Sequence, residues 1–143
     1  MRVEQISVFL ENKPGRLAKV ARLLGDNQIN IRALSVADTA DFGILRIIVA
    51  DPQKTFELLK AHGYIVTKTE VIAVEVPDRP GGMADILEFL QEAQVNIEYT
   101  YAFVQKGINS SLVVFRVEDP ERAEYLFAQH GIRVINGEEI GSI

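Results

Sequence analysis

The sequence predicts an α+β fold built from two copies of one small unit, and two observations indicate it. The segment of residues 11–17 recurs as residues 77–83, so that Pro14 and Gly15 are matched by Pro80 and Gly81, 66 positions later. Each copy also shows the same order of patterns: strand, helix, strand, strand, helix, strand. Because a fixed repeat indicates duplicated structural units, we divide the chain into module 1, residues 1–68, and module 2, residues 69–143.

Module 1 begins with an apolar strand pattern at residues 3–10, followed by the turn. In residues 16–27 the apolar positions fall at i, i+3, i+4 and i+7, which predicts a helix. Strands are expected at residues 29–37 and 44–50. Asp51 is a suitable N-cap and Pro52 a suitable first residue for the second helix, which ends at His62 and Gly63 before a strand at residues 64–66.

Module 2 repeats this order. We expect its strands at residues 71–76, 95–104, 110–117 and 132–135, and its helices at residues 82–93 and 120–130. Asp119 and Pro120 follow Asp51 and Pro52 by 68 positions, so two extra residues are expected in the hairpin of residues 105–109. Each module thus has the ferredoxin-like βαββαβ order, an antiparallel sheet with both helices on one face.

The end of the chain leaves two possibilities open. Glu138 and Ile140 follow Glu70 and Ile72 by 68 positions, so residues 138–143 resemble the beginning of another first strand. The tail either pairs with a sheet edge or frays.

Composition excludes several classes of function. The 143 residues include no cysteine, which excludes disulfides and thiolate nucleophiles and favours a cytoplasmic location. The net charge of −5 argues against nucleic acid as a partner, and no apolar run is long enough to cross a membrane. Units of about 70 residues are marginal alone, so the two modules are expected to share an interface, which is a natural place for a ligand.

The residues of the repeat resemble those of a known family. Residues 12–17, the following helix and residues 29–31 are similar to the ACT domain, the small amino-acid-sensing module of biosynthetic enzymes. Two such segments covering nearly the whole chain resemble a stand-alone tandem ACT protein. The resemblance implies two modules side by side, with their antiparallel sheets joined into one eight-stranded sheet and the helices on one face. It also implies an amino acid bound at the seam, beside the first turn.

The serine-sensing module of phosphoglycerate dehydrogenases binds its ligand with a His, the Asn of the turn and the Asn that opens the second strand. By similarity, these positions are Leu10, Asn12 and Asn30 in module 1. In module 2 the same positions carry Val76, Asp78 and Asn96. Module 1 therefore keeps both amides, which makes its turn the stronger candidate.

A free amino acid needs acceptors for its ammonium, donors for its carboxylate and a wall for its side chain. Backbone N–H groups after Pro14 lie at the positive end of a helix dipole and suit a carboxylate, while Gly15 lets a ligand approach the backbone. The alternative is that Asn12 and Asp78 only cap their helices or hold the turn. The remaining candidate ligand-binding residues flank the two turns and the second strands: Lys13, Arg16, Leu17, Ile31, Gly81, Gly82, Met83, Tyr99 and Tyr101.

The aromatic strand of module 2 has small counterparts in module 1. Tyr99, Tyr101 and Phe103 alternate along one strand face, and 66 positions earlier stand Ala33, Ser35 and Ala37. If these strands face each other, bulky side chains meet small ones. The tyrosines then belong either to a core or to the wall of one asymmetric pocket, and we expect the two sites to be non-equivalent.

The first helices of the two modules carry opposite charges. The first helix of module 1, with the turn before it, bears Lys13, Arg16, Lys19 and Arg22, whereas its counterpart bears Asp85, Glu88 and Glu92. These stripes either are solvated faces or fix the pairing of unlike modules.

The sequence thus predicts a non-catalytic amino-acid-binding regulatory protein without a cofactor or metal, which forms a homodimer and has a biosynthetic enzyme as a further candidate partner. The first alternative is an interaction subunit that needs no ligand, comparable to the small regulatory subunit of acetolactate synthase. The second is an acylphosphatase-like small enzyme, for which no convincing residue set is present. His62 and His130 are expected to stabilise equivalent helix ends.

Overall fold

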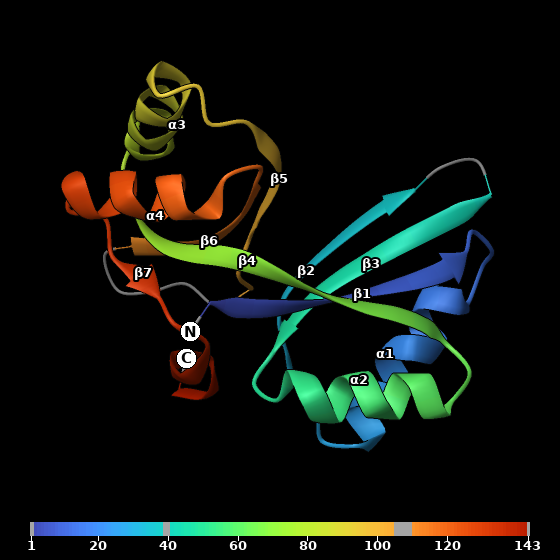
Figure 1. Cartoon of the computed structure of the whole chain (residues 1–143). Helices are drawn as coiled ribbons and strands as arrows, with labels where there is room; N and C mark the ends of the chain where they lie inside the picture. Colours follow the sequence, from blue (N-terminus) through green and yellow to red (C-terminus); the bar gives the residue numbers. More distant parts are fainter. Residues whose placement is uncertain (1, 39–40, 105–109, 143) are drawn as a thin grey trace.

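The computed structural model describes residues 2–38, 41–104 and 110–142. The chain forms two lobes, one for each module, and one curled sheet runs through both (Figure 1). The elements follow in the order β1 (Val3–Glu11), α1 (Arg16–Asp26), β2 (Ile31–Asp38), β3 (Phe42–Val49), α2 (Pro52–Ala61), β4 (Ile65–Pro77), α3 (Gly82–Glu92), β5 (Ile97–Ala102), β6 (Ser110–Val117), α4 (Pro120–Gln129), β7 (Val134–Ile135) and the 3-10 helix η1 (Gly137–Ser142).

All strand pairs are antiparallel, which confirms the predicted α+β class. The strand order is β2-β3-β1-β4-β6-β5, and β7 pairs with β4, giving a seven-stranded sheet. The eighth expected strand is missing because the strands expected at residues 64–66 and 71–76 are parts of one continuous strand, β4. The first part of β4 pairs with β1 and the second with β6, so the expected division at residue 68 falls within a strand that both modules share.

The two faces of the sheet bury different cores. On the outer face, α1 and α2 cover a module 1 core that includes Leu24 and Leu45, and α3 and α4 cover a module 2 core that includes Phe115 and Phe127. The inner face holds a third core between the modules, formed by Val3, Ala33, Ile48, Val71, Ala73, Phe103, Leu112, Val114, Ile135 and Ile140. The helices therefore share one face of the sheet, as predicted, but its curl carries the two pairs to opposite sides of the molecule (Figure 1).

The curl brings the two edge strands together. Ala33 of β2 pairs with Phe103, next to β5, and the Val104 amide donates to the Arg32 carbonyl at 2.8 Å. A small residue of module 1 thus meets a bulky one of module 2, as the repeat predicts. Because apolar side chains from both modules are buried together here, this contact stabilises the packing of one module on the other.

Both second helices begin and end as predicted. Asp51 accepts from the Lys54 amide at 3.1 Å, and Asp119 accepts from the Arg122 amide at 3.2 Å. At the other ends, His62 Nδ1–H donates to a carbonyl oxygen of the last turn at 2.9 Å, as His130 does in module 2. These histidines complete helix ends in both copies.

The tail neither pairs with a sheet edge nor frays over its described residues. It forms η1, and Ile140 is buried in the inner core with 1% of its surface exposed. The expected insertion at residues 105–109 lies outside the described residues. None of the helices in the described ranges is long and apolar enough to cross a membrane.

Candidate functional site

The two turns have the same backbone geometry. Gly15 and Gly81, each with a φ of 84°, precede α1 and α3 in the left-handed conformation that favours glycine. The Lys13 amide donates to Glu11 and the Arg79 amide to Pro77, both at 2.9 Å. Among the described residues, the N-cap positions of α1 and α3 make no side-chain cap hydrogen bond, in contrast to those of α2 and α4. Because glycines occupy both N-cap positions, the first turn of each helix offers backbone donors.

Asn12 lies among charges of both signs. Its Nδ2 donates to Asp38 Oδ2 at 3.4 Å, and its amide donates to the Asp41 carbonyl at 3.2 Å. The Lys13 ammonium lies 2.9 Å from Glu11 Oε2 and holds the pKa of that carboxyl below its usual value, and Arg16 lies 3.7 Å from the other Glu11 oxygen. Acceptors and donors for a zwitterion thus surround one amide.

Sequence reasoning missed Asp38 at this turn. Its carboxylate ends β2, 26 positions after Asn12, and is close only because β2 and β1 both flank β3. No local spacing in the sequence indicates that pairing. The candidate site in module 1 therefore contains Asn12, Lys13, Pro14, Gly15, Arg16, Leu17 and Asp38.

The structure does not bring Asn30 to Asn12 within one chain. Asn30 is exposed just before β2, whereas Asn12 contacts Asp38 at the far end of the same strand. Eight residues of extended chain separate these ends by about 26 Å. Ile31 is the first residue of β2 and lies next to Asn30, and Leu10 is buried in the module 1 core. Asn12 and Asn30 can therefore contact one ligand only if they come from different molecules.

The two turns lie at opposite ends of the molecule (Figure 1). β1 and β4 run antiparallel with Val3 opposite Val71. The strand ends at Glu11 and Pro77, where the two turns begin, therefore lie at opposite ends of the paired strands. Asp78, Gly81 and Met83 lie at the second turn, whereas Asn96 precedes β5 as Asn30 precedes β2. A seam that joins the first turn to module 2 is consequently not formed within one chain.

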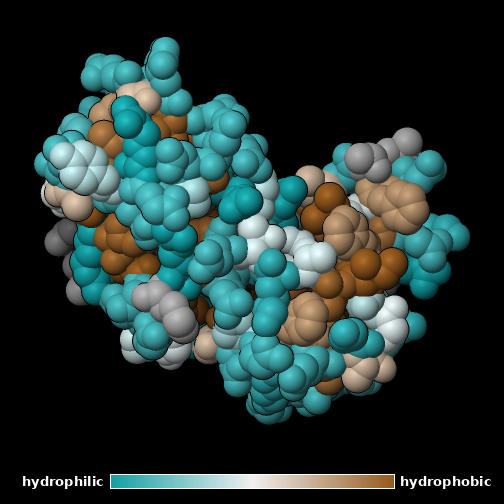
Figure 2. All heavy atoms as spheres, in the orientation of Figure 1, coloured by the Kyte–Doolittle hydropathy of each residue, from teal (hydrophilic) through white to brown (hydrophobic). Residues whose placement is uncertain are grey.

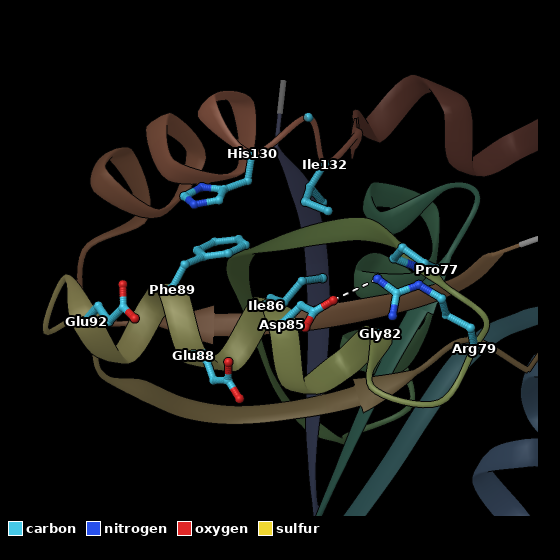
Figure 3. A pocket seen from close by; sticks show the side chains of 11 residues that line it. Pro77, Arg79, Gly82, Asp85, Ile86, Glu88, Phe89, Glu92, His130 and Ile132 are labelled. Atoms are coloured by element: carbon cyan, nitrogen blue, oxygen red, sulfur yellow. Dashed lines mark hydrogen bonds and ion pairs between the residues drawn. The ribbon is translucent and has the colours of Figure 1, made fainter.

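Each turn opens onto a groove between the first helix of its module and the end of the second. In module 2 the groove measures about 500 Å³, and Gly82, Asp85, Phe89 and His130 are among its lining residues (Figure 3). Arg79 donates to Asp85 at 2.7 Å, and the Phe89 and His130 rings stack at 4.0 Å.

The equivalent groove of module 1 is smaller and has the opposite charge. It measures about 280 Å³ and includes Arg16, Lys19, His62 and Tyr64 in its lining. Its cationic side chains favour a carboxylate, whereas Asp85, Glu88 and Glu92 make the module 2 groove acidic. The two copies are thus chemically different at equivalent places.

Tyr99 and Tyr101 lie at the contact between the modules. The Tyr101 hydroxyl donates to Gln5 Oε1 at 2.6 Å, and Gln5 Nε2 donates to the Tyr99 hydroxyl at 2.8 Å. The Arg46 guanidinium stacks 3.8 Å from the Tyr99 ring centre, and burial raises the pKa of the Tyr101 phenol. The tyrosines therefore hold module 2 on the inner face of module 1, away from both turns.

The charged first helices do not meet within the chain. α1 and α3 lie on opposite sides of the molecule (Figure 1), and charges on both pair locally, as in Arg79–Asp85 at 2.7 Å and Arg22–Asp26 at 4.0 Å.

Comparison with known proteins identifies the family of this chain. The chain matches the family of ACT domain pairs over residues 1–143. It is 36% identical to the solved structure of protein BT0572 from Bacteroides thetaiotaomicron, with a TM-score of 0.91 over 100% of this chain and 98% of that one. The regulatory subunit of aspartate kinase from Thermus thermophilus, ligand free, has the same fold at 18% identity, with a TM-score of 0.67 over 90% and 93% of the chains. No curated protein matches. The chain therefore belongs to the ACT domain pair family.

Proposed function

We propose that this protein is a non-catalytic, cytoplasmic, amino-acid-responsive regulatory protein whose ligand binds at the turn of module 1. The observation that carries the proposal is the opening of α1: an N-terminus without a side-chain cap, beside Asn12 and Asp38. Free backbone donors and the Lys13 and Arg16 cations suit the carboxylate of an amino acid. The Asp38 carboxylate suits its ammonium.

The apolar side chain of a ligand also has a wall available. Leu17 in the first turn of α1 is 42% exposed, and Leu34 and Val36 on the outer face of β2 are 42% and 50% exposed. Because Asn30 and the second turn are far from Asn12, we propose that a second copy of the chain completes the site. The similarity in fold to an aspartate kinase regulatory subunit supports a biosynthetic enzyme as the regulated partner.

Regulation then follows from linkage. A ligand that contacts two copies stabilises the arrangement in which both contacts are made, and a partner that prefers this arrangement binds more tightly.

A thermal-shift screen against the twenty amino acids tests the proposal. A ligand at 100 times its dissociation constant adds about 2.7 kcal/mol to the unfolding free energy, which for a chain of this size raises Tm by about 5–15 °C. Asn12→Ala and Asp38→Asn should reduce this shift. Asp119→Asn, which changes a carboxylate at a helix cap far from the turn, should retain it.

A flat screen would contradict ligand binding and favour an interaction subunit that needs no ligand. Hydrolysis of acyl phosphates by the purified protein would contradict the non-catalytic role.

A further inference from the structure

The inner face of module 1 carries an apolar patch whose side chains are exposed to solvent. Phe9, Phe42 and Ile65 are 38%, 56% and 69% exposed. They are contiguous, because Phe9 pairs with Ile65 on β4 and with Ile44 on β3, and Ile44 lies two residues from Phe42 on the same face of β3. Figure 2 shows apolar side chains gathered on module 1 beside the hollow between the lobes. We call Phe9, Phe42 and Ile65 the inner patch.

Module 2 provides an internal comparison for the inner patch. The repeat places Glu75, Ser110 and Arg133 at the positions of Phe9, Phe42 and Ile65. The strand pairing confirms the equivalence, since the Glu75 amide donates to the Arg133 carbonyl at 3.0 Å and Pro77 pairs with Ser110. Arg133 also donates to the Glu75 side chain at 2.9 Å. The same backbone site therefore folds with polar side chains, and folding alone does not require the apolar residues of module 1.

From this patch we infer that two copies of the chain associate face to face through the inner patch of module 1, across a two-fold axis at Phe9. The exposed parts of the three side chains amount to about 300 Å² of apolar surface. A stable dimer buries about 800 Å² per partner, roughly 60% of it apolar. The inner patch thus supplies more than half of the apolar area that a dimer needs, and the half-buried Ile44 adjoins it.

The charges at the two ends of the inner patch fit a two-fold axis that runs across the strands, in addition to the pairs that they make within one chain. Arg46 lies at the end next to module 2, and Glu11 lies at the other end, in register with Phe42. An axis across the strands reverses one copy relative to the other, so that the Arg46 end of each copy faces the Glu11 end of its mate. Self-complementary placement of this kind is what a two-fold interface requires.

The same axis has a consequence for the ligand site. It brings the turn of one copy, directly after Glu11, toward the module 2 of the other copy, where Tyr99 covers Arg46. Only this consequence rests on the proposed function. The contact itself follows from the inner face and needs no amino acid.

Disulfide trapping tests the contact, because the chain has no cysteine of its own. A residue beside a two-fold axis meets its own copy, so Phe9→Cys should give a disulfide-linked pair under mild oxidation without any amino acid present. Glu75→Cys, at the equivalent position of module 2, is the matched control and should remain monomeric on a non-reducing gel. Equal crosslinking of both variants, or none in Phe9→Cys, would overturn the inference.

Association in solution gives the second measurement. The triple variant Phe9→Glu, Phe42→Ser, Ile65→Arg copies the residues of module 2 and should keep its fold. Its dissociation constant for self-association should rise about 100-fold or more, as expected when three interface anchors are lost. Tyr125→Ser, which removes a 62% exposed aromatic from α4, should leave self-association unchanged. Light scattering that gives the triple variant and the wild type the same mass at every concentration would show that a second copy does not occupy the inner patch.

Discussion

Gly82 shows how one residue limits the second turn. A Cβ atom at this position would lie 2.2 Å from the Pro77 carbonyl oxygen, whereas at Gly25, inside α1, it would meet no atom within 4 Å beyond its chain neighbours and the backbone of its own helix. Gly82→Ala should therefore lower the unfolding free energy by about 1–3 kcal/mol through overpacking. Gly25→Ala should raise it by about 0.5–1 kcal/mol, because alanine is the better helix former. Urea unfolding measures both changes. An unchanged unfolding free energy in Gly82→Ala would show that the turn can widen.

Tyr101 should make stability depend on pH in the alkaline range. Burial raises the pKa of its phenol in the folded state above the ordinary value of 10.0. Above about pH 10 the unfolded chain loses this proton while the folded chain keeps it, so the unfolding free energy falls as pH rises. Urea titrations from pH 8 to 11 should show that the unfolding free energy of Tyr101→Phe falls less with rising pH than that of wild type. In the control variant Tyr125→Phe, which changes an exposed tyrosine, the unfolding free energy should fall with pH as it does in wild type.

At the scale of elements, most boundaries follow from local chemistry. The Asp-Pro pairs at residues 51 and 119 predict the starts of α2 and α4, since each Asp accepts a hydrogen bond from its helix and each Pro occupies the first position. The strand expected at residues 110–117 is also confirmed as β6. These features depend on neighbours in sequence, which a single chain displays.

Elements that depend on distant partners could not be predicted in the same way. Lys68, Thr69 and Glu70 are polar and resemble a junction, yet they form the middle of β4 because β1 pairs with them through Ile6, Gln5 and Glu4. The tail copies the start of a strand, but β4 already pairs with β1 and β6, and Ile140 is buried in the inner core instead. Both outcomes are decided by tertiary contacts.

The candidate site was predicted in part for the same reason. The glycine-opened turns and their difference between modules follow from Pro14, Gly15 and their imperfect copies. The separation of Asn12 from Asn30 follows from the direction and length of β2, and the contact of Asn12 with Asp38 follows from the sheet order. Resemblance names residue types but does not say which of them come from the same molecule.

The whole molecule should unfold in one step, because the modules share β4 and the inner core. Tyr64 and Ile132 occupy equivalent, half-buried positions in the two modules, and the chain has no tryptophan. Tyr64→Trp and Ile132→Trp therefore place matched fluorescent probes in the two lobes. Their urea transitions should coincide with each other and with the loss of circular dichroism. Two separate midpoints would show that each module is stable without the other.

The continuous β4 also restricts how the length of the chain can change at the join. Side chains alternate between the two faces of a strand, and in β4 Val66 and Ile72 both point to the outer face, while Val71 points to the inner one. An insertion of one residue between Val66 and Val71 would reverse this alternation for everything that follows, turning the apolar side chains meant for α3 and α4 toward module 1. An insertion of two would restore it. The join between the modules therefore obeys a parity rule that a flexible linker would not impose.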